Sequence, residues 1–345
     1  MKKFAFVLVL LSSLATVSAL AQAPVVSAVV NGFSFQNKLS PGVLASIFGT
    51  NLDGANLTVT LNGINCPVLF SSAGQVNVQI PWEATTGRGR VVLTHDGLGS
   101  APFAVTLNTY SPALAALNGS GSGDGIFFSG PNLITSSNPA NGGDSLQVWT
   151  IGLGATTPAI ATGAVTPPPP PSYTTLATPV LTVGGANQKL ILSGLLPGQI
   201  GVDQVNFTLG AGTPSGSQNV GLKIAGVPSS NAVTIAVGCR QVNSQVSIGK
   251  SALRKITATT YTQTVKITNK TTTDLPAAGS LVLTNLTPTT TLTNGGGASC
   301  PSSDGSPFAS ISFTGSGTSQ SATITLHFSD ATTGNITYGL RVLSN

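Results

Sequence analysis

Apolar and polar residues alternate along most of the chain, and a period of two residues is typical of β-strands. The alternation is clear at residues 57–61, 76–80 and 103–107, and it returns near the C-terminus at residues 324–328 and 336–342. Gly, Pro, Asn and Asp interrupt these runs at intervals of about 8–12 residues, the spacing found in antiparallel sandwiches. The sequence therefore predicts an all-β fold of immunoglobulin-like β-sandwiches.

Two parts of the chain carry similar features in the same order, which indicates an internal repeat. Each has a strand that ends in glycine, at residues 45–49 and 147–152, and then a Gln-Val-Asn triplet that begins at Gln75 or Gln204. The separation is greater in the second copy, whose extra residues include Pro167–Pro171. We expect two related sandwiches, with a stiff proline-rich loop at one end of the second.

The N-terminus has the features of a secretory signal peptide. A basic pair at residues 2–3 precedes the apolar segment 4–11, and Ala19 and Ala21 fit a cleavage site. The apolar segment is shorter than the roughly 20 residues that cross a bilayer, and no cysteine follows it for a lipid anchor. We therefore assign residues 1–21 to a signal peptide and expect a secreted protein, extracellular or periplasmic, without a membrane anchor.

Composition argues against catalysis. Charged residues make up only 7% of the chain, against about 25% in an average soluble protein. Glu83 is the one glutamate, and His95 and His327 are the two histidines, so ligands for zinc and groups for acid–base catalysis are scarce. We expect both histidines to be exposed and Glu83 to serve in a turn. The sequence predicts no catalytic residue, no metal site and no cofactor.

The charge distribution argues against a nucleic-acid partner. The formal net charge is +5, and basic residues are not clustered as they are in nucleic-acid-binding proteins. From Cys239 onward seven residues are basic and three are acidic, which fits either contact with an anionic surface or ordinary solubilising charge. The run Gly119–Gly125 has one carboxylate, too few for a calcium loop, and we expect it to be a flexible connection.

The chain has three cysteines, and an exported protein can form disulfides. Cys239 and Cys300 fall in the same C-terminal segment, so we predict that they pair and pin a loop to the start of that segment.

Cys66 shares its parity with Ile64, Val68 and Phe70. This parity predicts a core position for Cys66 as a small apolar residue, and it leaves open whether the thiol is free.

Several segments together resemble a known family. They are NGFSFQNKLSPGVLASIFGTNL from Asn31, VTLNG from Val59, GQVNVQIPWE from Gly74, NGSGSGDGIFF from Asn118 and SNPANGGDSLQVWTIGLG from Ser137. The chain resembles, over about Val25–Val237, a C-terminal domain of unknown function that is expanded in secreted acidobacterial proteins. The two halves of that domain are similar to IPT/TIG immunoglobulin-like modules. The resemblance implies an immunoglobulin-like fold and an extracellular setting.

We therefore expect three tandem immunoglobulin-like β-sandwich domains after the signal peptide. An IPT/TIG-like domain would span residues 22–116, a second domain with the proline-rich loop residues 117–238, and a threonine-rich sandwich residues 239–345.

These expectations favour a secreted, non-catalytic rod that acts as a binding and spacer protein in adhesion or glycan binding. Its partner would be a cell-surface polysaccharide or an envelope protein, bound by loops such as residues 163–175. A structural subunit of a surface fibre or sheath is one alternative. An extracellular hydrolase is another, and it would need a pocket that gathers Glu83, His95 or several aspartates. The ligand-binding residues are unknown from the sequence.

Overall fold

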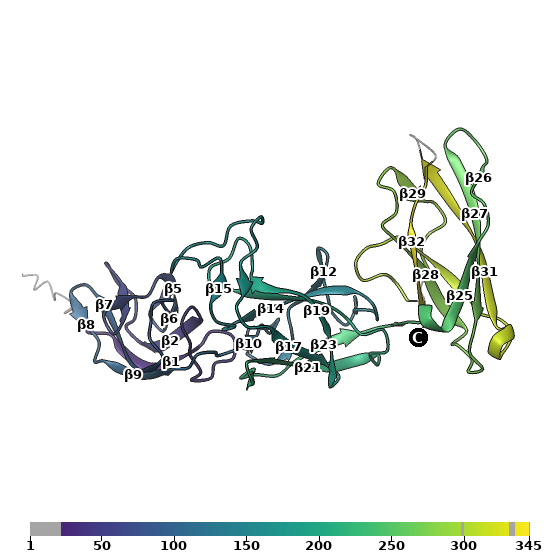
Figure 1. The fold of residues 1–345 in the computed structure, drawn as a ribbon. Coiled ribbons are helices and arrows are strands. Elements are labelled where there is room, and N and C mark those ends of the chain that lie inside the picture. Colours follow the sequence, from purple (N-terminus) through teal and green to yellow (C-terminus); the bar gives the residue numbers. More distant parts are fainter. Residues whose placement is uncertain (1–21, 298–299, 331–334, 345) are drawn as a thin grey trace, which may run out of the picture.

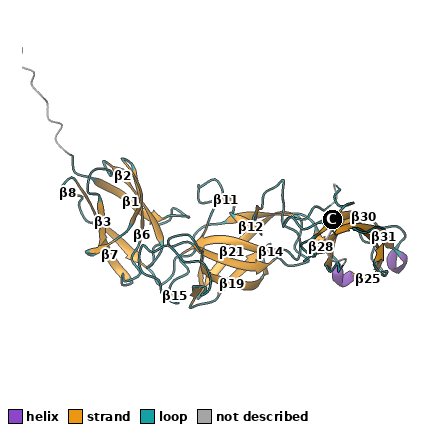
Figure 2. Cartoon of the chain, turned by 90° about the horizontal axis from the view of Figure 1, so that it is seen from above, coloured by secondary structure: helices purple, strands orange, loops and turns teal. Residues whose placement is uncertain are grey.

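The computed structural model describes residues 22–297, 300–330 and 335–344, so the predicted signal peptide lies outside the described residues. Strands account for 50% of the described residues and helix for 2%, which confirms the predicted all-β fold class (Figure 2). The helical elements of the described residues are two 3-10 turns, η1 (Asn243–Gln245) and η2 (Gly317–Ser319). No helix among the described residues has the length and apolar character that a bilayer span requires.

The first part of the chain contains two sheets that share one buried apolar cluster, and we call it the first sheet pair. One sheet has the order β1-β2-β6-β5, and the other has the order β4-β3-β7-β8 with β9 added beside β7. Val29, Ile47 and Leu93 lie in the shared cluster. The strands are β1 (Val25–Asn31), β2 (Leu44–Thr50), β3 (Thr58–Leu61), β4 (Ile64–Asn65), β5 (Val68–Ser72), β6 (Gln75–Gln79), β7 (Gly87–His95), β8 (Leu98–Gly99) and β9 (Phe103–Leu107).

The second sheet pair follows and encloses its own cluster, in which the Phe127 and Phe207 rings meet edge to face with centroids 6.5 Å apart. One sheet has the order β13-β12-β14-β20-β19-β16-β15 with β10 beside β14, and the other has β11-β23-β21-β17-β18 with β22 beside β21. Because β10 pairs with β14, this strand set begins before the predicted boundary at residue 117. The strands are β10 (Ala113–Leu114), β11 (Gly123–Asp124), β12 (Phe127–Ser129), β13 (Asn132–Leu133), β14 (Ser145–Ile151), β15 (Thr156–Thr157), β16 (Thr174–Thr175), β17 (Pro179–Val183), β18 (Ala186–Asn187), β19 (Lys189–Leu195), β20 (Asp203–Thr208), β21 (Gly216–Ile224), β22 (Val227–Pro228) and β23 (Val233–Val237).

The same strand order recurs in the first two sheet pairs. The sheet β1-β2-β6-β5 corresponds to β12-β14-β20-β19, and the strands β3, β7 and β9 correspond to β17, β21 and β23. The two glycine-ended segments of the repeat form β2 and β14, and the two Gln-Val-Asn triplets lie in β6 and β20. The connection from β14 to β17 is longer than that from β2 to β3, and it holds Pro167–Pro171.

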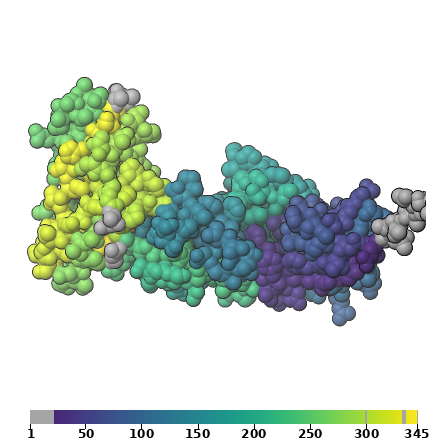
Figure 3. All heavy atoms as spheres, turned by 180° about the vertical axis from the view of Figure 1, so that it is seen from behind, coloured from purple at the N-terminus to yellow at the C-terminus, as the bar shows by residue number. Residues whose placement is uncertain are grey.

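The third sheet pair has the orders β24-β32-β28-β30 and β25-β27-β31-β29, with β26 beside β27. Its cluster includes Val265, Leu281 and Phe328. Figures 1 and 3 show this pair turned away from the line of the first two, so the three sheet pairs do not share one straight axis. The strands are β24 (Arg240–Gln241), β25 (Val246–Lys250), β26 (Arg254–Lys255), β27 (Thr260–Asn269), β28 (Ala278–Thr284), β29 (Thr290–Leu292), β30 (Phe308–Ser312), β31 (Ser321–Asp330) and β32 (Gly339–Ser344).

The shared parity predicted for residues 64–70 is wrong. Cys66 is buried as expected, and burial raises the pKa of its thiol to about 12. Ile64, Val68 and Phe70 are exposed instead. The alternation is broken because β4 ends before Cys66, and because β5 starts anew with a register shift between Val68 and Phe70. Val68 and Phe70 therefore lie on β5 and Ile64 lies on β4, and both strands are at an edge of their sheet.

Asp203 of β20 places a carboxyl group inside the second sheet pair. The residue is 2% exposed, and its Oδ2 accepts a hydrogen bond from the backbone N–H of Leu153 at 3.0 Å. Oδ1 has no hydrogen-bond partner among the described atoms. Burial raises the pKa of Asp203 from its ordinary value of 3.8 to about 7. Between these two pH values the folded protein holds a proton that the unfolded chain releases.

We expect Asp203 to make the folded protein less stable as the pH rises from about 4 to about 7. The folded state binds more protons across this window, so the free energy of unfolding should fall by about 1.4 kcal/mol per pH unit while Asp203 alone titrates. Asp203→Asn should remove this slope, whereas Asp53→Asn, at an exposed position, should keep it. Urea unfolding at a series of pH values measures the slope, and equal slopes for wild type and Asp203→Asn would contradict the prediction.

Candidate functional site: a basic groove and two joints

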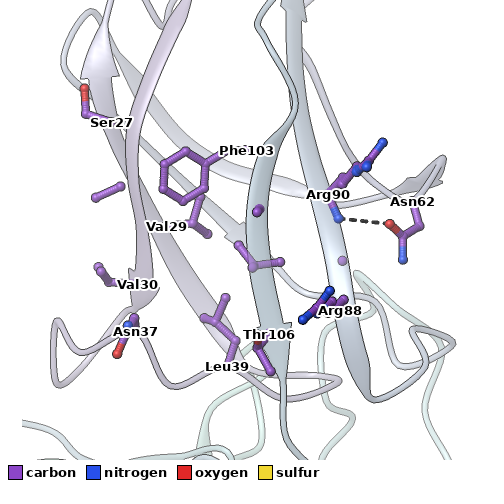
Figure 4. A pocket seen from close by; sticks show the side chains of 14 residues that line it. Ser27, Val29, Val30, Asn37, Leu39, Asn62, Arg88, Arg90, Phe103 and Thr106 are labelled. Carbon is purple, nitrogen blue, oxygen red and sulfur yellow. Dashed lines mark hydrogen bonds between the residues drawn. The ribbon is translucent and has the colours of Figure 1, made fainter.

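A groove of about 850 Å³ lies between β1 and β9, at neighbouring edges of the two sheets of the first pair. β1 pairs with β2 and β9 pairs with β7, and the two edge strands do not pair with each other. Figure 4 shows polar side chains on both sides and apolar side chains between them. The residues that it labels on one side are Ser27, Val30 and Asn37, those between the strands are Val29, Leu39 and Phe103, and those toward β7 are Asn62, Arg88 and Arg90.

Arg88 and Arg90 give the groove its charge. Side chains alternate along β7, so both arginines project to one side and Gly89 faces the other, where an added Cβ would lie 2.8 Å from the Leu61 side chain. The backbone N–H of Arg90 donates to Oδ1 of Asn62 at 2.9 Å. Neither guanidinium group has a hydrogen-bond or ion-pair partner among the residues that the structure describes. The lining residues include no acidic side chain, so the groove is positively charged.

The first joint connects the first and second sheet pairs through buried polar side chains. The hydroxyl oxygens of Ser40 and Ser111 lie 2.7 Å apart, and Nδ2 of Asn31 donates to the carbonyl of Ser111 at 3.0 Å. The backbone N–H of Ser111 donates in turn to the carbonyl of Gly152, just after β14. These bonds hold the end of one sheet pair against the start of the next.

The proline-rich connection of the second sheet pair contributes to the same joint. The hydroxyl of Thr162 donates to Oε2 of Glu83 at 2.6 Å and accepts from the backbone N–H of Trp82 at 2.9 Å. The backbone N–H of Gly163 donates to Oε1 of Gln79 at 2.7 Å. The hydrogen bond from Thr162 lowers the pKa of the exposed Glu83 carboxyl. The GQVNVQIPWE segment thus ends at an inter-sheet-pair contact, which the turn predicted for Glu83 did not anticipate.

A buried ion pair between Asp144 and Arg341 forms the centre of the second joint. Asp144 lies just before β14 and Arg341 lies in β32, and the two residues are 0% and 6% exposed. The hydroxyl of Ser303 and the backbone N–H of Asn141 also donate to the Asp144 carboxylate. Nη2 of Arg341 lies 3.8 Å from Oδ2 of Asp304. Burial raises the pKa of Asp144, and the Arg341 charge and these hydrogen bonds act in the opposite direction.

A disulfide between Cys239 and Cys300 lies beside this ion pair, with the Cα atoms 5.6 Å apart. The backbone N–H of Cys239 donates to Oδ1 of Asn141, and Nδ2 of the same asparagine donates to the carbonyl of Pro301, both at 2.8 Å. The disulfide therefore holds the segment that begins at Cys300 against the second sheet pair, next to Asp144.

The structure gives the two histidines different environments. His95 is 2% exposed, with Nε2 2.7 Å from the carbonyl of Asn51 and Nδ1 3.1 Å from Oδ2 of Asp96. The predicted exposure of His95 is wrong because it shares the parity of Val91 and Leu93, which face the core of the first sheet pair. His327 of β31 is exposed, as predicted.

The end of the glycine-rich run Gly119–Gly125 belongs to a sheet of the second pair and is not only the predicted connection. Its β11 pairs in parallel with β23, and the hydroxyl of Thr234 donates to Oδ1 of Asp124 at 2.9 Å. Gly121 also packs against the backbone of Phe33. Among the described residues no group of three or more His, Cys, Asp or Glu side chains could hold a metal ion.

Removing the cation of the second joint should destabilise the protein. Arg341→Met leaves the Asp144 carboxylate buried without its counter-charge, a change that costs about 3–5 kcal/mol in comparable buried pairs. The matched control Arg240→Met, at an exposed position of β24, should change stability by less than about 0.5 kcal/mol. Calorimetric unfolding compares the two variants, and a control-sized effect of Arg341→Met would contradict the importance of this pair.

The pairing of Cys239 with Cys300 is tested by peptide mapping of the unreduced protein. A linked peptide that contains both residues is expected, with Cys66 recovered as a thiol. The bond spans 61 residues, so the chain-entropy model predicts that Cys239→Ser/Cys300→Ser loses about 4 kcal/mol of stability. Recovery of free thiols at both positions would show the pairing to be absent.

Comparison with known proteins identifies one part of the chain. The SGBP-B of the Bacteroides ovatus mixed-linkage glucan utilization locus is 14% identical, over 90% of this chain and 74% of that chain, with a TM-score of 0.30. The SGBP-B from a complex xyloglucan utilization locus in Bacteroides uniformis is 9% identical, over 94% of this chain and 98% of that chain, with a TM-score of 0.26. The Escherichia coli adhesin FdeC is 15% identical, over 93% of this chain and 96% of that chain, with a TM-score of 0.21. Scores this low support no inference on ligand or function. No curated protein matches the chain, and the wider resemblance to the acidobacterial domain stays a prediction. The family model of the IPT/TIG domain matches residues 28–111, so an IPT/TIG immunoglobulin-like domain occupies that part of the first sheet pair.

Proposed function

We propose that the protein is a secreted, non-catalytic binding and spacer protein, and that its three sheet pairs are three immunoglobulin-like domains. The observation that carries this proposal is that both joints are closed by buried polar side chains. A polar group that loses its partner inside a protein costs about 1–3 kcal/mol, and a charged group costs more. The domains are therefore held in one relative orientation, which is what a spacer requires.

The binding part of the proposal rests on the groove between β1 and β9. It is concave and combines an apolar floor with a few polar groups. Its lining residues Val30 and Leu39 directly precede Asn31 and Ser40 of the first joint, and the second joint involves none of its lining residues. The loop at residues 163–175, which the sequence favoured for binding, starts within the first joint because Gly163 contacts Gln79. We therefore move the proposed binding surface from that loop to the groove.

The hydrolase alternative receives no support from the positions of the titratable residues. Glu83 contacts Thr162 at the first joint, His95 is buried in the first sheet pair, and His327 lies on β31 of the third. General acid–base catalysis requires such groups within hydrogen-bond reach of one substrate.

A fibre subunit is the second candidate function, and the exposed edge strand β5 favours it. Val68, Leu69 and Phe70 are 37%, 40% and 50% exposed on a strand with one free edge. Such an edge can pair with the same strand of a second copy. Light scattering distinguishes the two functions, because a fibre subunit associates with increasing concentration and Leu69→Lys should abolish that association.

We expect the purified mature protein to bind a polysaccharide or an envelope protein without turning it over. A glycan array and a pull-down from envelope extract test binding, and product analysis tests turnover. Empty results in both binding assays would remove the binding part and leave a spacer. Small-angle scattering tests the spacer part, since fixed joints predict one bent particle and a broad distribution of sizes would contradict them.

A further inference from the structure

The polar lining of the groove between β1 and β9 is rich in hydrogen-bond donors. Arg88 and Arg90 carry ten donor N–H groups between them, and Nδ2 of Asn62 is available because only its Oδ1 is engaged, by the backbone of Arg90. Asn37 and Thr106 are exposed in the same lining. A groove with these donors and no carboxylate selects a ligand that is both anionic and rich in oxygen acceptors.

The two guanidinium groups are accessible because their neighbours across the ladder are small. Arg88 lies opposite Thr106 and Arg90 lies opposite Ala104 on β9. Residues two apart on one strand are separated by about 6.8 Å. The pair therefore presents two cations along one side of the groove, at a spacing that a linear polyanion can follow.

The apolar floor indicates what else the ligand must offer. Phe103 is half-buried, while Val29, Leu39 and Val105 are buried beneath the opening. Figure 4 shows the Phe103 ring between β1 and β9. Phe103 pairs with Val91 and therefore faces the other side of the sheet from Arg88 and Arg90. A ligand that contacts both must cross the free edge of β9, and it needs an apolar face as well as charge. Sugar rings have such a face in their C–H bonds, and uronic acids add a carboxylate to each ring.

The spacing of the two edge strands disfavours an extended peptide. A peptide that joined both edges as a new strand would need about 9.6 Å between β1 and β9, which is twice the spacing of paired strands. Several Cα atoms of β1 lie within 8 Å of Cα atoms of β9. The groove is therefore too narrow to accept an added strand over its whole length. A ligand must be bound by the side chains of the groove and not by the backbone of the two edge strands.

We propose that the groove between β1 and β9 binds an acidic polysaccharide, with uronate carboxylates at Arg88 and Arg90 and a sugar ring against Phe103. Guanidinium groups bind carboxylates through two parallel hydrogen bonds. The side chains of Asn37, Asn62 and Thr106 then form hydrogen bonds with the sugar hydroxyls. This inference rests on the proposed binding function and names its ligand class.

Calorimetric titration of the full mature protein with polygalacturonate tests the proposal, with methyl-esterified polygalacturonate as the ligand control. Esterification removes the charge and keeps the sugar, so we expect binding to weaken at least tenfold. Arg88→Ala/Arg90→Ala should weaken binding of the charged polymer by at least tenfold. The matched control Arg254→Ala/Lys266→Ala removes two exposed cations from the third sheet pair and should leave the affinity within twofold of wild type.

A second variant blocks the groove without removing an arginine. Ala104→Glu places a carboxylate directly opposite Arg90 and should also reduce binding at least tenfold. Because positions 88, 90 and 104 are exposed, we expect unchanged circular dichroism and melting temperature for both variants.

Several results would overturn the proposal. Equal binding of the esterified and charged polymers, unchanged binding by Arg88→Ala/Arg90→Ala, or equal loss in the third-sheet-pair control would each do so. Tighter groove-dependent binding of poly-glutamate would assign the groove to an acidic peptide instead. If neutral glycans bind and the arginine variant retains that binding, the proposed function survives while this inference fails. If no glycan and no envelope protein binds, the binding function fails as well.

Discussion

The buried carboxylate of Asp144 is the constraint on which the arrangement of the molecule depends. An ionised group without water needs a counter-charge and hydrogen bonds, and here they come from both sides of a joint. Asn141 belongs to the second sheet pair, whereas Arg341 and Ser303 belong to the third. Separating the two sheet pairs would leave the charges without partners. The cost of burying these charges without partners therefore favours one orientation of the two sheet pairs. Apolar contact alone would let the sheet pairs slide against each other.

Local alternation was sufficient to predict the fold class, because each strand buries one face and exposes the other. This alternation failed to predict burial where the position of a strand end decided which residues face the core. The run at residues 64–70 is interrupted between β4 and β5, so Phe70 is exposed although it shares parity with the buried Cys66. His95 was expected to be exposed, yet the parity of β7 buries it. In both cases the position of the strand end decided the outcome.

The candidate site was beyond prediction from the sequence for a topological reason. Its walls come from β1, β7 and β9. In the sequence, Arg88 and Arg90 of β7 are merely two of the basic residues, and only the pairing of β7 with β9 shows that they line a groove. The joints have the same origin. Gln79 and Glu83 meet residues 162–163 across a sequence distance of about 80 residues, and no local pattern encodes such a meeting. The composition alone still led to the prediction of no catalytic residue and no metal site, because the chain has few ionisable side chains.

Fixed joints and a groove on the first sheet pair have a combined consequence. The effective concentration of a bound partner depends on the length and stiffness of what connects the binding site to its anchor. Flexible linkers would let the groove sample many positions, whereas joints closed by Asp144 and by Ser111 hold it at one position relative to the third sheet pair. Under the proposed function, a partner of the third sheet pair is then kept at a set distance and direction from a ligand in the groove.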